Sequence, residues 1–195
     1  AYPLGYINQH NVDPERWLRY MRVGDPDLQA LFHDIYRACG RGRWWVMEQQ
    51  PGPVNWAPWN PAPAPGAIRL WAWEAFAAGA EVVSYFRWRQ APFGQEQMHE
   101  GLRLPDGSEN EAYRVVRQVA AEIEATGAAV ETTKADVAII FDYESAWAWS
   151  IQPQGASFNY LGLVLTFYRA LREFGISVDI IPAQPGAAED YRLVI

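Results

Sequence analysis

The sequence has 195 residues, half of them hydrophobic, with a formal net charge of −7 and a single cysteine, Cys39. An acidic chain without a Lys/Arg-rich run argues against nucleic acid and anionic membranes as partners. One cysteine excludes an internal disulfide and favours a reducing, cytoplasmic compartment, and Cys39 is expected to be buried in packing. The most apolar long segment, residues 67–86, is a poor membrane span because it contains Arg69, Glu74 and Glu81.

Helices and strands alternate along the first 130 residues. Hydrophobic periodicity and turn signals predict the end of a strand and a loop over 1–12, helices over 13–23 and 25–40, an apolar strand over 43–48 of the kind buried on both faces, a helix over 67–79, a strand over 81–89 and a helix over 108–127. Each of the first two helices begins with Asp-Pro, where the aspartate is the expected N-cap. Ser108 and Glu111 predict a capping box for the last helix, with Ser108 as N-cap.

Long loops over 49–66 and 90–106 follow the carboxyl ends of the strands, whereas the returns from helix to strand are short. This asymmetry is typical of an α/β protein of the (β/α)8 barrel type, whose active face is built from the βα loops. Because a whole barrel needs roughly 250 residues and only two complete strand–helix units are visible, we expect residues 1–130 to be part of a longer protein.

The pattern restarts after residue 130. The sequence predicts a strand over 137–143, a helix over 159–175 and strands over 176–181 and 191–195. We therefore expect residues 131–195 to be the start of a second, truncated α/β domain.

A lone carboxylate, Glu48, ends the apolar strand 43–48, ahead of a loop rich in proline and tryptophan. In a β/α protein, a carboxylate at this end of a strand points into the catalytic mouth. The alternative is a structural salt bridge to Arg87 or Arg89 of the next strand. Both interpretations can hold together, because a neighbouring arginine would keep a nucleophilic carboxylate ionised.

Glu96 and His99 lie three residues apart in the second long loop. A carboxylate metal site would need this spacing twice, and a hydrolytic triad would need a serine or cysteine at a nucleophile elbow. The remaining interpretation is recognition of hydroxyl groups. Trp56, in the first loop, adds a flat apolar platform, so the combination suits a sugar, which has one apolar face and a rim of hydroxyls.

Three strings, WWVMEQQPGPVNWAPWNPAPAPG, FRWRQAPFGQEQMHEGL and DVAIIFDYESAWAW, together resemble glycoside hydrolase family 42, the β-galactosidases. The resemblance covers essentially the whole chain. It implies that residues 1–130 are the C-terminal portion of a (β/α)8 TIM barrel and that residues 131–195 begin a flavodoxin-like trimerisation domain. It also implies a retaining β-galactosidase without a cofactor, which assembles as a homotrimer and hydrolyses terminal β-D-galactose residues of β-galactosides or galacto-oligosaccharides.

Residue by residue, the resemblance makes Glu48 the nucleophile that forms the glycosyl-enzyme. The residues that it implies in sugar binding are Tyr2, Trp56, Glu96 and His99. The family's acid/base is a glutamate in an Asn-Glu pair on an earlier strand, whereas Asn110-Glu111 here lies at a helix start. We therefore assign no acid/base and expect the chain alone to be inactive. Some members carry a cysteine-rich structural zinc site in an earlier half, on which these residues do not report, and no metal site is expected here.

Two alternatives stay open. One is a non-catalytic carbohydrate-binding or assembly fragment, which would keep Trp56 but would not need Glu48. The other is a glycosidase of different sugar specificity on the same barrel, acting for example on β-L-fucosides or α-L-arabinopyranosides, whose rings share the galactose pattern. The presence of Glu48, Glu96 and His99 together speaks against the first.

Overall fold

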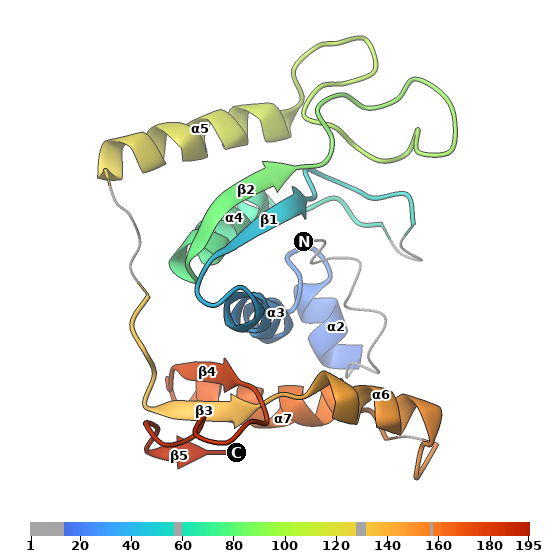
Figure 1. The fold of residues 1–195 in the computed structure, drawn as a ribbon. Helices are drawn as coiled ribbons and strands as arrows, with labels where there is room; N and C mark the ends of the chain where they lie inside the picture. Colours follow the sequence, from blue (N-terminus) through green and yellow to red (C-terminus); the bar gives the residue numbers. More distant parts are fainter. Residues whose placement is uncertain (1–13, 57–59, 128–131, 157) are drawn as a thin grey trace. The chain divides into compact units, whose positions relative to one another are not determined.

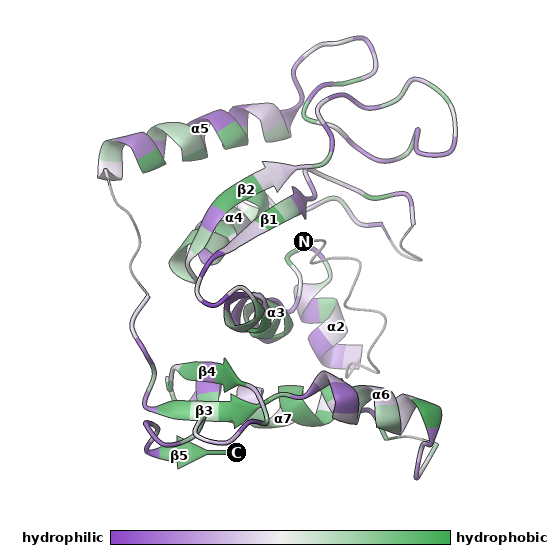
Figure 2. Cartoon of the chain, viewed as in Figure 1, coloured by the Kyte–Doolittle hydropathy of each residue, from purple (hydrophilic) through white to green (hydrophobic). Residues whose placement is uncertain are grey.

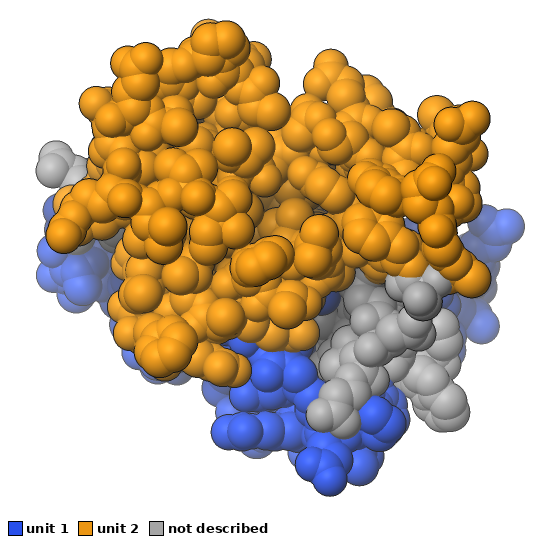
Figure 3. All heavy atoms as spheres, turned by 90° about the horizontal axis from the view of Figure 1, so that it is seen from below, with its two compact units in different colours: residues 1–29, 43–132 blue, residues 30–42, 133–195 orange. Residues whose placement is uncertain are grey.

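The structure is a computed structural model that describes residues 14–56, 60–127, 132–156 and 158–195. The chain forms two compact units, which Figure 3 colours separately. Unit 1 comprises residues 1–29 and 43–132, and unit 2 comprises residues 30–42 and 133–195. Among the described residues, no helix combines the length and the apolar character needed to cross a membrane.

The described residues form helices and strands in the following order. Those up to residue 127 are α2 (Pro14–Tyr20), α3 (Pro26–Cys39), β1 (Trp44–Gln49), α4 (Ala67–Ala77), β2 (Ala80–Tyr85) and α5 (Glu111–Thr126). Those after it are β3 (Val137–Ile140), α6 (Tyr143–Ile151), α7 (Tyr160–Glu173), β4 (Val178–Ile181) and β5 (Leu193–Val194). The prolines at the starts of α2 and α3 occupy the first helical position as predicted, and Asp25 caps α3 by accepting from the backbone N–H groups of Asp27 and Leu28.

Unit 1 is built on β1 and β2, which pair in parallel. Figure 1 shows both arrowheads pointing the same way, with the two long loops leaving from that end. Trp44 and Val46 of β1 pack with Ala75 of α4 and with Ala80. The prediction that β1 is buried on both faces is wrong for this chain, because Trp45 and Met47 on the opposite face are 53% and 64% exposed. Buried and exposed residues alternate at the start of the strand because α4 covers one face of the two-stranded sheet.

The start of α5 differs from the capping box that the sequence predicts. Asn110 is the N-cap, and its side chain accepts a hydrogen bond from the backbone N–H of Glu111. Ser108 instead donates its hydroxyl to Asp106, 2.6 Å away. An Asx turn at Asp106 therefore uses the serine one turn before the helix begins.

Unit 2 contains a parallel three-stranded sheet in the order β4-β3-β5. The first strand of the unit lies in the centre, with the second and third on either side, which is the order at the start of a flavodoxin-like sheet. β3 is mostly apolar (Figure 2), and the helix α7 buries Val164, Leu165, Tyr168 and Leu171. α6, which the sequence did not predict, begins directly after β3 with Asp142 as N-cap.

Cys39 is exposed, so the prediction that it is buried is wrong. It is the last residue of α3, one turn beyond the buried Ile35, so the helix ends before the side chain of residue 39 is covered. Leu31, His33 and Ile35 are buried in the middle of the helix.

Candidate active site

Glu48 lies one residue before the end of β1, and its side chain is exposed. The residues that follow are fixed. Gln49 and Gln50 are fully buried, the carbonyl of Gln49 accepts from the backbone N–H of Phe86, and the Gln50 amide donates to the carbonyl of Gly52 at 2.7 Å. The strand thus presents an exposed carboxylate next to a hydrogen-bonded and buried stretch of chain.

The loop after β2 is closed at its base. Three backbone hydrogen bonds of 2.8 to 2.9 Å join residues 87–90 to residues 102–103. The segment between them carries both Glu96 and His99. The loop therefore leaves and returns at one place beside the end of β2, which limits the freedom of both side chains.

Arg87 binds Glu96 in two ways. Its Nη1 lies 3.2 Å from Oε2 of Glu96 and 3.4 Å from the backbone carbonyl of the same residue. The guanidinium also lies over the ring of Phe86, 5.2 Å from the centroid. This arginine was considered from the sequence as a partner of Glu48, and the structure shows it paired with the other carboxylate.

His99 is buried, at 2% exposure, and its ring meets Phe86 edge-on with a centroid distance of 4.9 Å. Burial lowers the pKa of His99 below its ordinary value. A hydrogen bond with the Phe86 backbone and the negative charges of Glu96 and Glu48 oppose this shift in pKa, whereas Arg87 adds to it. A neutral imidazole can both donate to and accept from a hydroxyl group. The charges of both Glu48 and Glu96 act on the ring of His99.

The first long loop contacts this group through Asn55. Its Oδ1 lies 3.3 Å from Nδ1 of His99, and its amide donates to the carbonyl of Gln95 at 3.4 Å. Trp56 is the next residue and is 42% exposed. The predicted sugar platform thus follows directly a residue that touches the predicted hydroxyl-binding histidine. Tyr2 lies outside the described residues.

Three residues at this site were not predicted to belong to it in these roles: Asn55, Phe86 and Arg87. Phe86 and Arg87 come directly after β2, in the place where Glu48 ends β1, so the rule that selected Glu48 could have found them. Asn55 is adjacent to the selected Trp56. Within the described ranges, no group of three or more His, Cys, Asp or Glu side chains could hold a metal ion.

Two protein families match this chain. Residues 2–126 match the family described as beta-galactosidase, and residues 135–195 match the beta-galactosidase trimerisation domain. A β-galactosidase of Thermus thermophilus is 58% identical over 188 residues, which are 96% of this chain and 29% of that protein. The β-galactosidase Bga of Halorubrum lacusprofundi is 46% identical over 93% of this chain and 26% of its own length.

Solved structures agree. The β-galactosidase of the psychrophilic Marinomonas ef1 superimposes with a TM-score of 0.92 at 49% identity, covering all of this chain and 31% of that one. The chain thus spans less than a third of the length of these relatives. The predicted fold, a C-terminal portion of a TIM barrel followed by the start of a second α/β domain, is confirmed. On these matches, the chain belongs to glycoside hydrolase family 42.

Proposed function

We propose that the complete protein is a retaining β-galactosidase that releases terminal β-D-galactose through a glycosyl-enzyme on Glu48. The observation that carries the proposal is that Glu48 lies at the carboxyl end of β1, while Glu96 and His99 lie on the loop that follows the neighbouring parallel strand β2. The relatives support the substrate class, because the similar proteins of Thermus and Halorubrum are β-galactosidases. A fragment that only binds sugar or only assembles would have no use for Glu48.

Retaining glycosidases use two carboxyl groups about 5–5.5 Å apart. In the proposed reaction, Glu48 attacks the anomeric carbon while a second carboxyl, which we do not assign to this chain, gives its proton to the departing oxygen. The glycosyl–Glu48 ester forms as the glycosidic bond breaks. The second carboxylate then removes a proton from water, and the water's oxygen displaces Glu48 and releases galactose. The fixed end of β1 supplies the orientation that this attack requires.

Recognition of galactose falls to the loop residues. The carboxylate of Glu96, held by Arg87, accepts from sugar hydroxyls, and the neutral ring of His99 donates to or accepts from another. Trp56 lies against the apolar face of the ring, and Tyr2 completes the subsite as the family resemblance implies. Loss of one partner of a buried hydroxyl costs about 1–3 kcal/mol, so Glu96→Ala should clearly weaken inhibition by galactose.

The test of the nucleophile is Glu48→Gln in the complete protein. It should lower turnover of an aryl β-galactoside by several orders of magnitude without changing the circular dichroism spectrum. A 2-deoxy-2-fluorogalactoside should label Glu48 of the wild type, and peptide mass spectrometry locates the label. A label on another residue, together with an active Glu48→Gln variant, would disprove the assignment.

Assembly is proposed from unit 2. Residues 135–195 match a trimerisation domain, so we propose that the complete protein is a homotrimer. Light scattering coupled to size exclusion should give three times the subunit mass at micromolar concentration. A stable monomer there would contradict the proposal.

A further inference from the structure

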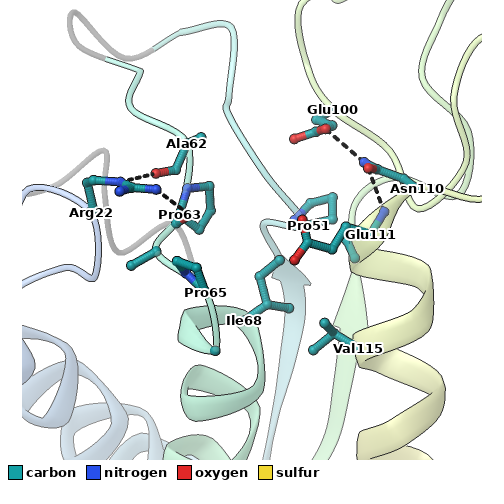
Figure 4. A pocket seen from close by; sticks show the side chains of 13 residues that line it. Arg22, Pro51, Ala62, Pro63, Pro65, Ile68, Glu100, Asn110, Glu111 and Val115 are labelled. Carbon is teal, nitrogen blue, oxygen red and sulfur yellow. Dashed lines mark hydrogen bonds between the residues drawn. The ribbon is translucent and has the colours of Figure 1, made fainter.

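Glu100 directly follows His99 but lines a pocket of about 250 Å³ in unit 1 that is separate from the candidate active site. The pocket lies among the first long loop, the start of α4 and the first turn of α5, and Figure 4 shows Glu100 and Asn110 at one side of it. Neither Glu48 nor His99 lines it. A carboxylate in this place does not touch the sugar site, so another explanation is needed for its contacts.

Glu100 joins three segments of unit 1. Its backbone N–H donates to the carbonyl of Pro53 in the first long loop, at 3.1 Å. Its Oε1 accepts from the amide of Asn110, the N-cap of α5, at 2.8 Å, and the same amide donates to the carbonyl of Gly101 at 3.0 Å. The backbone of Glu100 thus connects the loop that bears His99 to the loop that bears Trp56, and its carboxylate connects it to the start of α5.

Gly52 makes room for this arrangement. A Cβ atom at Gly52 would overlap the Glu100 carboxylate, which fills the space where a side chain would stand. Glu100 is only half-buried, yet burial raises its pKa above the ordinary value, while the hydrogen bond from Asn110 lowers the pKa and the charge of Glu111 raises it. Burial therefore works against the charged form, and the contacts with Asn110 and the neighbouring backbone hold the side chain there.

We infer that Glu100 is a positioning residue for sugar recognition, whose carboxylate fixes the loop bearing Glu96 and His99 against the first long loop at Gly52 and against the start of α5 at Asn110. The inference rests on the proposed β-galactosidase activity. Glu100 does not touch the sugar. Its loss lets the loop shift relative to Glu48, and a displacement of about 1 Å at a reacting centre can cost up to a hundredfold in rate.

The experiment compares four variants of the complete protein: Glu100→Ala, Glu100→Gln, Gly52→Ala and the matched control Glu111→Gln. Glutamine at 100 keeps an oxygen that can accept from Asn110. Alanine at 52 keeps Glu100 but displaces its carboxylate. Glutamine at 111 removes an equal charge from the lining of the same pocket. For each, kcat, KM and the galactose inhibition constant are measured with an aryl β-galactoside, with active sites counted by 2-deoxy-2-fluorogalactoside.

Glu100→Ala and Gly52→Ala should each raise KM and the galactose inhibition constant about tenfold, with a smaller fall in kcat per labelled site. A fifth variant that combines Glu100→Ala with Gly52→Ala should have the same constants as either single variant, because both changes break the same contact. Glu100→Gln and Glu111→Gln should stay within about twofold of wild type in all three constants.

A wild-type inhibition constant in Glu100→Ala overturns the inference, as does an equal loss in Glu111→Gln or in Glu100→Gln. If Glu100→Ala does not fold, Gly52→Ala decides, and wild-type constants there overturn the inference. Failure of the proposed function has a different signature, namely a wild-type protein without β-galactoside hydrolysis or a fully active Glu48→Gln variant.

Discussion

Replacing Arg87 with methionine would remove the group that orients Glu96 and leave most of the side-chain stem in place. The guanidinium of Arg87 binds the carboxylate of Glu96 at 3.2 Å and its carbonyl at 3.4 Å, and it covers one face of Phe86. The carboxylate would keep its charge but lose its fixed direction. We expect weaker binding of galactose with little change in the stability of the fold.

We expect a small effect on fold stability because the ion pair is exposed to solvent, and a larger effect on galactose binding because the carboxylate must be ordered again. The side chains of Arg87 and Glu96 are 26% and 46% exposed, so solvent screens the ion pair, and its contribution to the free energy of unfolding is about 1 kcal/mol or less. Binding of a sugar must order the freed carboxylate again, which costs about 0.5–1.5 kcal/mol for one side chain. A weaker hydrogen bond to the sugar hydroxyl adds to this cost, so we expect a total of about 1–2 kcal/mol, or roughly five- to thirtyfold in the inhibition constant.

The assay is inhibition of aryl β-galactoside hydrolysis by galactose, measured beside the melting temperature of the complete protein. Arg89→Met is the matched control, because Arg89 lies two residues further along the same segment and pairs through its backbone with Arg103. An unchanged inhibition constant in Arg87→Met would refute the reasoning. An equal loss in Arg89→Met would show that positive charge near the loop matters, and not the contact with Glu96.

Two further predictions concern the stability of unit 2. Burial lowers the pKa of His33 to about 3 from an ordinary 6.5, so below pH 6.5 only the unfolded chain binds a proton there, and the free energy of unfolding should fall by up to about 1.4 kcal/mol per pH unit between about 6.5 and 3. In urea unfolding, the free energy of unfolding of the wild type minus that of His33→Leu should become smaller as the pH falls from 7 to 5. A difference that does not change with pH would contradict this. The hydroxyl of Tyr168 donates to the carboxylate of Asp34 at 2.5 Å, so Tyr168→Phe should cost about 1–2 kcal/mol in unfolding free energy, whereas Tyr143→Phe, at a residue 44% exposed, should cost less.

Much of the fold could be predicted because local signals and packing agree. Asp25 and Pro26 together predict a helix start, and in the structure Asp25 caps α3 and Pro26 is its first residue, as predicted. Glu48 could be selected because strand ends in β/α proteins share one side of the sheet. These predictions depend on neighbours in sequence and on a rule of topology, and neither requires knowledge of loop geometry.

Each error has its own local cause. Ser108 has the residue type and spacing of an N-cap, but its hydroxyl donates to Asp106, and the side chain of Asn110 accepts from the first helical N–H in its place. The helix α6 was missed because it begins right after β3 and its apolar residues do not keep to one face. Cys39 was assigned to the interior from residue type alone, although a helix's last turn often faces water.

Contacts between loops were beyond the reach of the sequence. Asn55 meets His99 across 44 positions of the chain, and Arg87 reaches Glu96 only because the loop folds back on its own base. Each bond depends on the path of a loop whose proline-rich sequence has no periodicity. A strand end identifies where a site lies, but the partners of each side chain follow from geometry that periodicity does not encode.

The proposed nucleophile and the proposed sugar-binding residues stand on different parts of the chain. Glu48 stands on β1 itself, whereas Glu96 and His99 stand on a loop that is attached to the first loop through Asn55, and through the bond from the Glu100 backbone to Pro53. In the proposed reaction, contacts between the loops would position a galactose ring bound by the second loop over Glu48. Changes at those contacts should act first on sugar affinity, because they move the ring and its partners together. Changes on β1 should act first on turnover, because they alter the nucleophile while leaving the contacts to the ring in place.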